Sequence, residues 1–369
     1  MQLFAALAGC GLLALILVDA FSTIVVPRRS LHMFRIARAF YRFTWAPFAA
    51  IGRRIRSGPR REEFLSVYGP LSLLTLLALW AGGLILAFGL LQWAAGMQPD
   101  KMAGTLTNDI YISATTLFTL ASGNPQNEAS KYLTVIEGGL GICFLGMVVG
   151  YLPVLYESSS QRERRISFLD ARAGSPPSAA DLLAAAPSSA RFLEREFVEW
   201  EKWAAQLLES QLSFPMLVYF RSHHSNQSWL TALVAIIDAA SILALCAEDE
   251  DLRLQAELTF AMGRHTLADV SAVLRIPKVS PSDDRLTKQE FGRLLKTLRE
   301  SRAPLAVHKI SIEQLNRFRG MYETPAAMLS QYLMMALPAW ISSDEQRENW
   351  RNSGSMQEVY AVSDPFRED

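Results

Sequence analysis

The sequence predicts an all-α membrane protein with three transmembrane helices, a re-entrant helix and loop before the third, and an all-α cytoplasmic domain. Three observations support this. The first 157 residues are rich in Leu, Ala, Gly and Phe, whereas the remainder has the mixed composition of a soluble protein. Arginines cluster beside the apolar stretches. The C-terminal part has helical periodicity and no strand-like alternation.

Three apolar stretches are long enough for the roughly 20 residues that a helix needs to cross a bilayer. They cover residues 1–26, 64–93 and 132–156. The first could be a secretory signal peptide, but no basic residue precedes its apolar run, and Arg28 and Arg29 follow it. A retained helix is therefore expected.

Segment 27–63 contains ten Arg, no Lys and two Glu, in a chain whose formal net charge is zero. The positive-inside rule places this segment in the cytoplasm, and Arg162, Arg164 and Arg165 place the residues after the third span there as well. The chain is therefore expected to be a multi-pass protein of the cell (inner) membrane, with its N-terminus outside and its C-terminus cytoplasmic. Aromatic residues among the arginines predict a helical segment lying on an anionic inner leaflet.

Residues 107–120 predict a short helix, because apolar residues recur in it at helical spacing and Thr107 can cap it. This helix is too short to cross a bilayer. The sequence "TLASGNP" that follows contains small residues and a glycine. Irregular backbone at membrane depth is tolerated only where protein buries it or where it lines water. A re-entrant segment is therefore expected.

The order helix, short helix, loop, helix and cytoplasmic domain resembles the pore of the two-transmembrane potassium-channel family, in which four loops present carbonyl oxygens to the ion. The stretch "TTLFTLASGNP" is similar to that family's Thr-rich pore helix running into T-V-G-Y-G-D, which implies that Thr115 and Thr116 end the pore helix. The implied selectivity filter consists of Thr119, Leu120, Ala121, Ser122, Gly123 and Asn124. The motifs "DAFSTIVVPRR", "ISFLDARAGSPP" and "RSHHSNQSW" resemble a bacterial channel-like subgroup with an extra N-terminal helix.

This resemblance implies four parts: an N-terminal transmembrane helix (1–26), a basic interfacial segment (27–63), a pore domain (64–157) and a cytoplasmic helical domain (158–369). It also implies a homotetramer, because one loop cannot surround an ion. The filter departs from the family at Ala121, which stands where the first Gly belongs, and at Ser122, which replaces the aromatic residue. A left-handed backbone costs a residue with a β-carbon about 1 kcal/mol. A permeating monovalent cation, K⁺ or Na⁺, with weak preference between them is therefore expected.

The third span carries further candidate residues. Glu137 is predicted to bond the loop behind the filter, to add charge to the outer pore, or to be a protonated carboxyl group bonded to a Thr. Gly146 and Gly150 suit close helix packing or bending. Pro153 predicts a kink, either at a gate or where the helix ends. In the first span, Asp19 is expected to pair with an arginine of the basic segment.

After a linker that begins at 171, Ser178 and Asp181 predict a capping box. The expected helices are 179–186, 188–212, 228–248, 251–262, 286–302, 311–322 and 324–336. The apolar run 229–245 is a borderline fourth span, but Asp238 interrupts it, so a buried core helix is preferred.

Several function classes lack support. No P-loop, GxGxxG after a strand, HExxH or GxSxG occurs, so an enzyme, a nucleotide-binding gating domain and a bound cofactor are not expected. Cys10, Cys143 and Cys246 suggest neither disulfides nor zinc, and no nucleic-acid partner is expected. The leading hypothesis is a tetrameric cation channel with a cytoplasmic regulatory domain and an unknown gating ligand. A non-conducting sensor or scaffold with the same fold is the alternative, and a transporter is weaker because no inverted repeat is visible.

Overall fold

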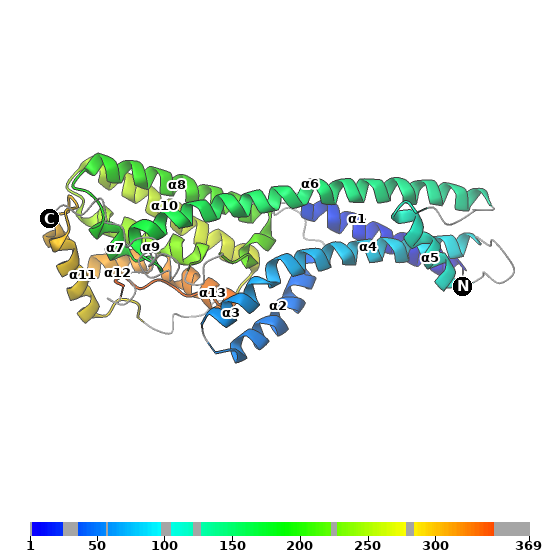
Figure 1. Cartoon of the computed structure of the whole chain (residues 1–369), viewed down its shortest axis with the longest axis horizontal. Coiled ribbons are helices and arrows are strands. Elements are labelled where there is room, and N and C mark those ends of the chain that lie inside the picture. The colour runs from blue at the N-terminus through cyan, green and yellow to red at the C-terminus, as the bar shows by residue number, and fades with distance from the viewer. Residues whose placement is uncertain are drawn as a thin grey trace, which may run out of the picture. The chain divides into compact units, whose positions relative to one another are not determined.

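The computed structural model describes residues 2–24, 36–56, 58–96, 105–120, 127–222, 227–277 and 284–342. Within these ranges the regular elements are helices, as predicted, and one isolated bridge joins Ala247 and Leu305 (Figure 1). The chain divides into two compact units. The first is Met1–Ile55 with Val67–Ser158, and the second is Arg56–Ser66 with Ser159–Asp369.

In the part of the chain that the structure describes, four helical stretches are long and apolar enough to cross a membrane: Gln2–Ile24, Pro59–Ala95, Glu128–Asp170 and Trp229–Cys246. The first lies within the predicted span 1–26, and the second and third contain the predicted spans 64–93 and 132–156. The helices that lie wholly in the first unit are α1 (Gln2–Ile24), α2 (Ile36–Arg54), α4 (Tyr68–Ala95) and α5 (Leu106–Leu117).

Helices α1 and α4 pack closely through small residues. A β-carbon at Gly9 of α1 would lie 2.9 Å from the carbonyl oxygen of Ala87, and one at Gly83 of α4 would overlap the side chain of Ile16. Such close approach is typical of helix pairs in membranes, where van der Waals contact replaces the hydrophobic effect.

Asp19, which is buried in α1, connects three helices of the first unit. Its carboxylate accepts hydrogen bonds from the backbone N–H of Ala37 in α2, at 3.1 Å, and from the indole N–H of Trp80 in α4, at 2.9 Å. The N–H of Ala37 is one of the first four of α2 and has no partner within its own helix. These two partners are neutral groups that were not predicted from the sequence, and the expected pairing of Asp19 with an arginine of segment 27–63 stays a prediction.

Helix α6 (Glu128–Ala173) begins in the first unit and ends in the second. Its 46 residues include Pro153, so the helix does not end there as one of the two predictions required. At 1.5 Å per residue it is about 69 Å long, roughly twice the hydrocarbon thickness of a bilayer. The linker begins only after Ala173, where Gly174 adopts a φ of 78°.

The second unit is a helical domain, and every helix predicted for it is present. Its remaining elements are α3 (Pro59–Ser66), α7 (Ala179–Ala184), α8 (Ala190–Ser213), η1 (Pro215–Tyr219), α9 (Trp229–Cys246), α10 (Glu250–Leu274), α11 (Lys288–Glu300), η2 (Val307–Lys309), α12 (Ile312–Arg319) and α13 (Glu323–Leu333). Ser178 caps α7 by accepting from the N–H of Asp181, which confirms the predicted start of that helix. Helix α10 extends twelve residues past its predicted end at Met262.

Helix α9 forms the core of the second unit. Of its 18 residues only Leu245 is not buried, so 94 % of this apolar helix is buried within the protein. In the most apolar stretch of α6, by comparison, 17 % of the residues are buried. This burial explains the apolar composition of α9 without a membrane, and it agrees with the preference for a core helix.

Candidate functional site

Helix α5 packs along α4 in the first unit and contacts α6 at Gly141 and Glu137. A β-carbon at Gly89 of α4 would lie 3.0 Å from the α-carbon of Ile110 in α5. One at Gly141 of α6 would overlap the carbonyl oxygen of Leu117, at the end of α5. Glycine at these two positions therefore allows the short helix to sit against both long ones.

Ser113 of α5 connects the same three helices by hydrogen bonds. Its hydroxyl lies 2.9 Å from the backbone oxygen of Ile85 in α4 and is also bonded to Oε1 of Glu137 in α6. A hydroxyl carries one hydrogen. When Ser113 donates to the Ile85 carbonyl, its bond to Glu137 therefore requires a proton on the carboxyl group.

Glu137 is fully buried, and its partner is this serine rather than a threonine. Its second oxygen has no hydrogen bond among the described residues, and the same holds for Oδ1 of Asp109, which is buried in the first turn of α5. The sequence analysis did not consider Asp109 or Ser113. The position of an acidic residue in a helix's first turn could have identified Asp109, whereas no local pattern identifies Ser113 as the partner of Glu137.

The implied filter begins at Thr119, two residues after the last residue of α5. Thr115 and Thr116 are buried in the last turn, and the hydroxyl of Thr115 donates to the carbonyl of Ile112 at 2.8 Å. Thr119 adopts a φ of 62°, a strained conformation for a β-branched residue, and its N–H donates to the carbonyl of Thr116. Leu120 is exposed. The other four positions, 121–124, lie outside the described residues.

The glycines of α6 differ in their surroundings. Gly141 is in close contact with α5, but a β-carbon at Gly146 or Gly150 would meet nothing within 4 Å. Packing inside one chain therefore does not require glycine at those two positions. With Gly139 and Cys143 they recur every three or four residues along one face, away from the buried Glu137 and Gly141. The exposed Pro153, three residues after Gly150, continues this face.

In the second unit, the arginines that follow the third span make structural contacts. Arg162 is buried and donates to the backbone oxygens of Leu217, at 3.0 Å, and Phe220, at 2.9 Å, at the end of η1. Farther along α6, Arg165 pairs with Glu199 and Arg172 with Glu196, both on α8. These arginines therefore join α6 to the domain, besides any effect on membrane orientation.

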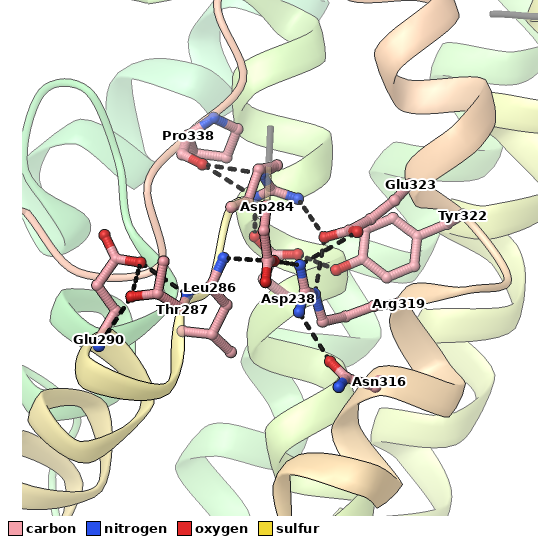
Figure 2. Close-up of polar contacts among 11 residues, drawn as sticks. Asp238, Asp284, Leu286, Thr287, Glu290, Asn316, Arg319, Tyr322, Glu323 and Pro338 are labelled. Atoms are coloured by element: carbon pink, nitrogen blue, oxygen red, sulfur yellow. Dashed lines mark hydrogen bonds and ion pairs between the residues drawn. The ribbon is translucent and has the colours of Figure 1, made fainter. Parts of the chain in front are cut away.

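A network of charged side chains surrounds Asp238, which is fully buried in α9 (Figure 2). Its carboxylate accepts from the Arg285 guanidinium at 2.5 Å and from the hydroxyl of Tyr322. Arg285 also donates to the backbone oxygen of Pro338, at 2.9 Å, and lies 3.5 Å from Glu323. The network thus connects α9 with the segment before α11, with α13 and with the chain that follows it.

A second guanidinium continues this network (Figure 2). Arg319 of α12 pairs with Asp284 at 2.5 Å and with Glu323 at 2.9 Å. The hydrogen bond from Arg319 is the main cause of a lowered pKa of the Asp284 carboxyl group. Burial raises the pKa of Tyr322, and the negative charge of Asp238 raises it further, so the phenol remains a donor. The three acidic residues of the network, Asp238, Asp284 and Glu323, therefore each have a partner. The network serves to hold the domain together.

Among the described residues, no group of three or more His, Cys, Asp or Glu side chains could hold a metal ion. Comparison of the chain with protein-family models, with characterised proteins and with solved structures finds no match. The function is therefore inferred from the chain's own residues.

Proposed function

We propose that four copies of this chain form a potassium-channel-like cation channel with a degenerate selectivity filter and a cytoplasmic regulatory domain. The observation that carries this proposal is the placement of α5. Its 12 residues span about 18 Å, too little for a bilayer core of about 30 Å, yet it packs between α4 and α6, which are long enough. A re-entrant helix and the polar turn after it need protein or water around them.

The exposed surface of α6 supports assembly with further copies of the chain. Val135, Ile142 and Val149 lie two turns apart and are each more than 60 % exposed in a single chain. The open glycine face, with Gly146 and Gly150, lies on the same helix. In a tetramer, α6 would line the axis and contact its neighbours, so both surfaces would be covered by other copies or by the water-filled pore.

The filter proposal is tested by ion substitution in planar bilayers. The unmodified protein is expected to conduct K⁺ and Na⁺ with weak preference, because Ala121 does not favour the left-handed backbone and Ser122 does not support the filter from behind. The double change Ala121→Gly with Ser122→Tyr is expected to increase the preference for K⁺. Strong K⁺ selectivity of the unmodified protein would contradict this interpretation of Ala121.

Assembly is tested separately by native mass spectrometry in mild detergent, where tetramers are expected. Only monomers or dimers would argue against a pore. The departures at Ala121 and Ser122 favour one second candidate, a non-conducting sensor or scaffold that retains the channel fold. Intact tetramers without current, in both the unmodified and the doubly substituted protein, would favour that candidate.

A further inference from the structure

The second unit contains a cavity of about 250 Å³ where five parts of the chain meet. Its walls come from the start of α3, from the linker after α6, from the stretch after η1, from the start of α9 and from the chain after α13. The lining includes Arg61, Glu62, Arg221, Thr231, Met335 and Leu337. None of them belongs to the Asp238 network or to the proposed pore.

Arg221 is held rigidly in the wall, with only 6 % of its side chain exposed. It pairs with Glu62 of α3 and donates to the backbone oxygens of Leu333, at 2.5 Å, and Met334, at 3.3 Å. The hydroxyls of Ser228 and Thr231 in the same wall are also used, since Thr231 donates to the carbonyl of Ala336 at 2.7 Å and Ser228 bonds to Thr231. These groups shape the cavity and have little capacity for a ligand.

Arg61 differs from these groups. Its Nε is buried without a hydrogen bond among the described residues, and its one described ion pair, with Glu62, is long at 3.9 Å. Glu62 already pairs with Arg221. Burial lowers the pKa of Arg221, Glu62 raises it, and the positive charge of Arg61 lowers it, so the two guanidiniums repel each other across the wall. Two arginines and one glutamate leave one positive charge in excess.

We propose that this cavity binds a small organic anion whose carboxylate or phosphate group pairs with Arg61, while its apolar part lies against Met335 and Leu337. A planar guanidinium with free N–H groups suits two-point pairing with either anion. Pockets for drug-sized ligands have volumes of about 300–1,000 Å³. The ligand of this cavity is therefore expected to be smaller than a drug-sized molecule. The proposal concerns binding alone and does not depend on ion conduction.

The test uses the full chain in detergent at fixed ionic strength, with two charged probes and their neutral counterparts: propyl phosphate with 1-propanol, and propionate with propionamide. Calorimetric titration is expected to show saturable binding of at least one charged probe and none of its neutral counterpart. Arg61→Ala is expected to weaken that binding at least tenfold. The matched control is Arg60→Ala, since Arg60 is the exposed neighbour on α3 and does not line the cavity.

Three results would overturn the proposal. One is that neither charged probe binds more tightly than its neutral counterpart. Another is that Arg61→Ala binds the charged probe as tightly as the unmodified chain. The third is that Arg60→Ala weakens binding as much as Arg61→Ala does, which would indicate attraction to the general positive charge of the segment. Hydrogen exchange of α3 and α9 in each variant verifies that the unit remains folded, so that lost binding is not attributed to unfolding.

Discussion

Arg285→Met is expected to destabilise the second unit by about 3–5 kcal/mol, which is typical when one partner of a buried ion pair is removed. The structure explains why the effect falls in this range. Asp238 is fully buried, and without the guanidinium its only remaining described partner is the hydroxyl of Tyr322. The backbone oxygen of Pro338 loses its donor as well.

The Asp238–Arg285 pair contributes much less to the free energy of unfolding than is lost when one of its two partners is removed. Charged groups are expensive to bury, so replacing a whole buried pair by apolar residues of similar volume is often close to neutral. The triple change Asp238→Leu, Arg285→Met and Tyr322→Phe is therefore expected to recover at least half of the lost stability. Arg293→Met on α11 is the control, because Arg293 is exposed, and a change within about 0.5 kcal/mol is expected.

Thermal unfolding of the full chain in detergent measures these differences, and hydrogen exchange with mass spectrometry assigns them to α9–α13. For a domain of this size, 1 kcal/mol corresponds to about 2–4 °C in Tm, so Arg285→Met is expected to lower the Tm of this unit by about 6–20 °C. A Tm within 2 °C of the Arg293→Met control would refute the argument. So would a triple variant that is less stable than Arg285→Met.

Three further predictions concern other parts of the chain. Gly141→Ala is expected to lower the free energy of unfolding by about 1–3 kcal/mol, because the methyl group would overlap the end of α5. Gly138→Ala is the control, because a β-carbon there meets nothing within 4 Å, and equal thermal stability of the two variants would contradict the contact. Arg162→Met is expected to lower the free energy of unfolding by about 1–3 kcal/mol, because two backbone oxygens lose their donor, whereas Arg164→Met, at an exposed position, is expected to have little effect. A lower Tm for Arg164→Met than for Arg162→Met would contradict the structural role of Arg162. Reporter fusions are expected to place the N-terminus outside and the C-terminus in the cytoplasm, and an external C-terminus would overturn the arginine argument.

The helices of the second unit could be predicted because their signals are local. Helical periodicity marks each one, and caps such as Ser178, Thr287 and Ser311 lie next to the helices they begin. The apolar spans were predictable for the same reason, since length and composition are properties of a single segment. The end of α6 could not be predicted in this way. A proline such as Pro153 disfavours a helix locally, but contacts with the domain stabilise the helix beyond this proline, and they are made by Arg162, Arg165 and Arg172.

The polar contacts were much harder to predict. Asp238 meets partners 47 and 84 residues away, and no local pattern identifies Arg285 or Tyr322 among the other arginines and tyrosines. At the candidate pore, the sequence predicted the short helix and selected Glu137, but its serine partner on α5 depends on how two helices pack. Local signals therefore predicted the elements, and only the folded chain determines which side chains meet.

The hydrogen bonds of Asp19 also bear on how the first unit is inserted into a membrane. A carboxylate at the centre of a helix costs about 2.5–3.5 kcal/mol when that helix is inserted by the translocon, and Asp19, near the end of α1, carries part of this cost. Helix α1 is synthesised first and carries this cost until α2 and α4 follow. The N–H groups of Ala37 and Trp80 then give the carboxylate two donors, both from later segments of the chain. Insertion of α1 is therefore completed by the helices after it, and the cost of its one acidic residue becomes a driving force for their association.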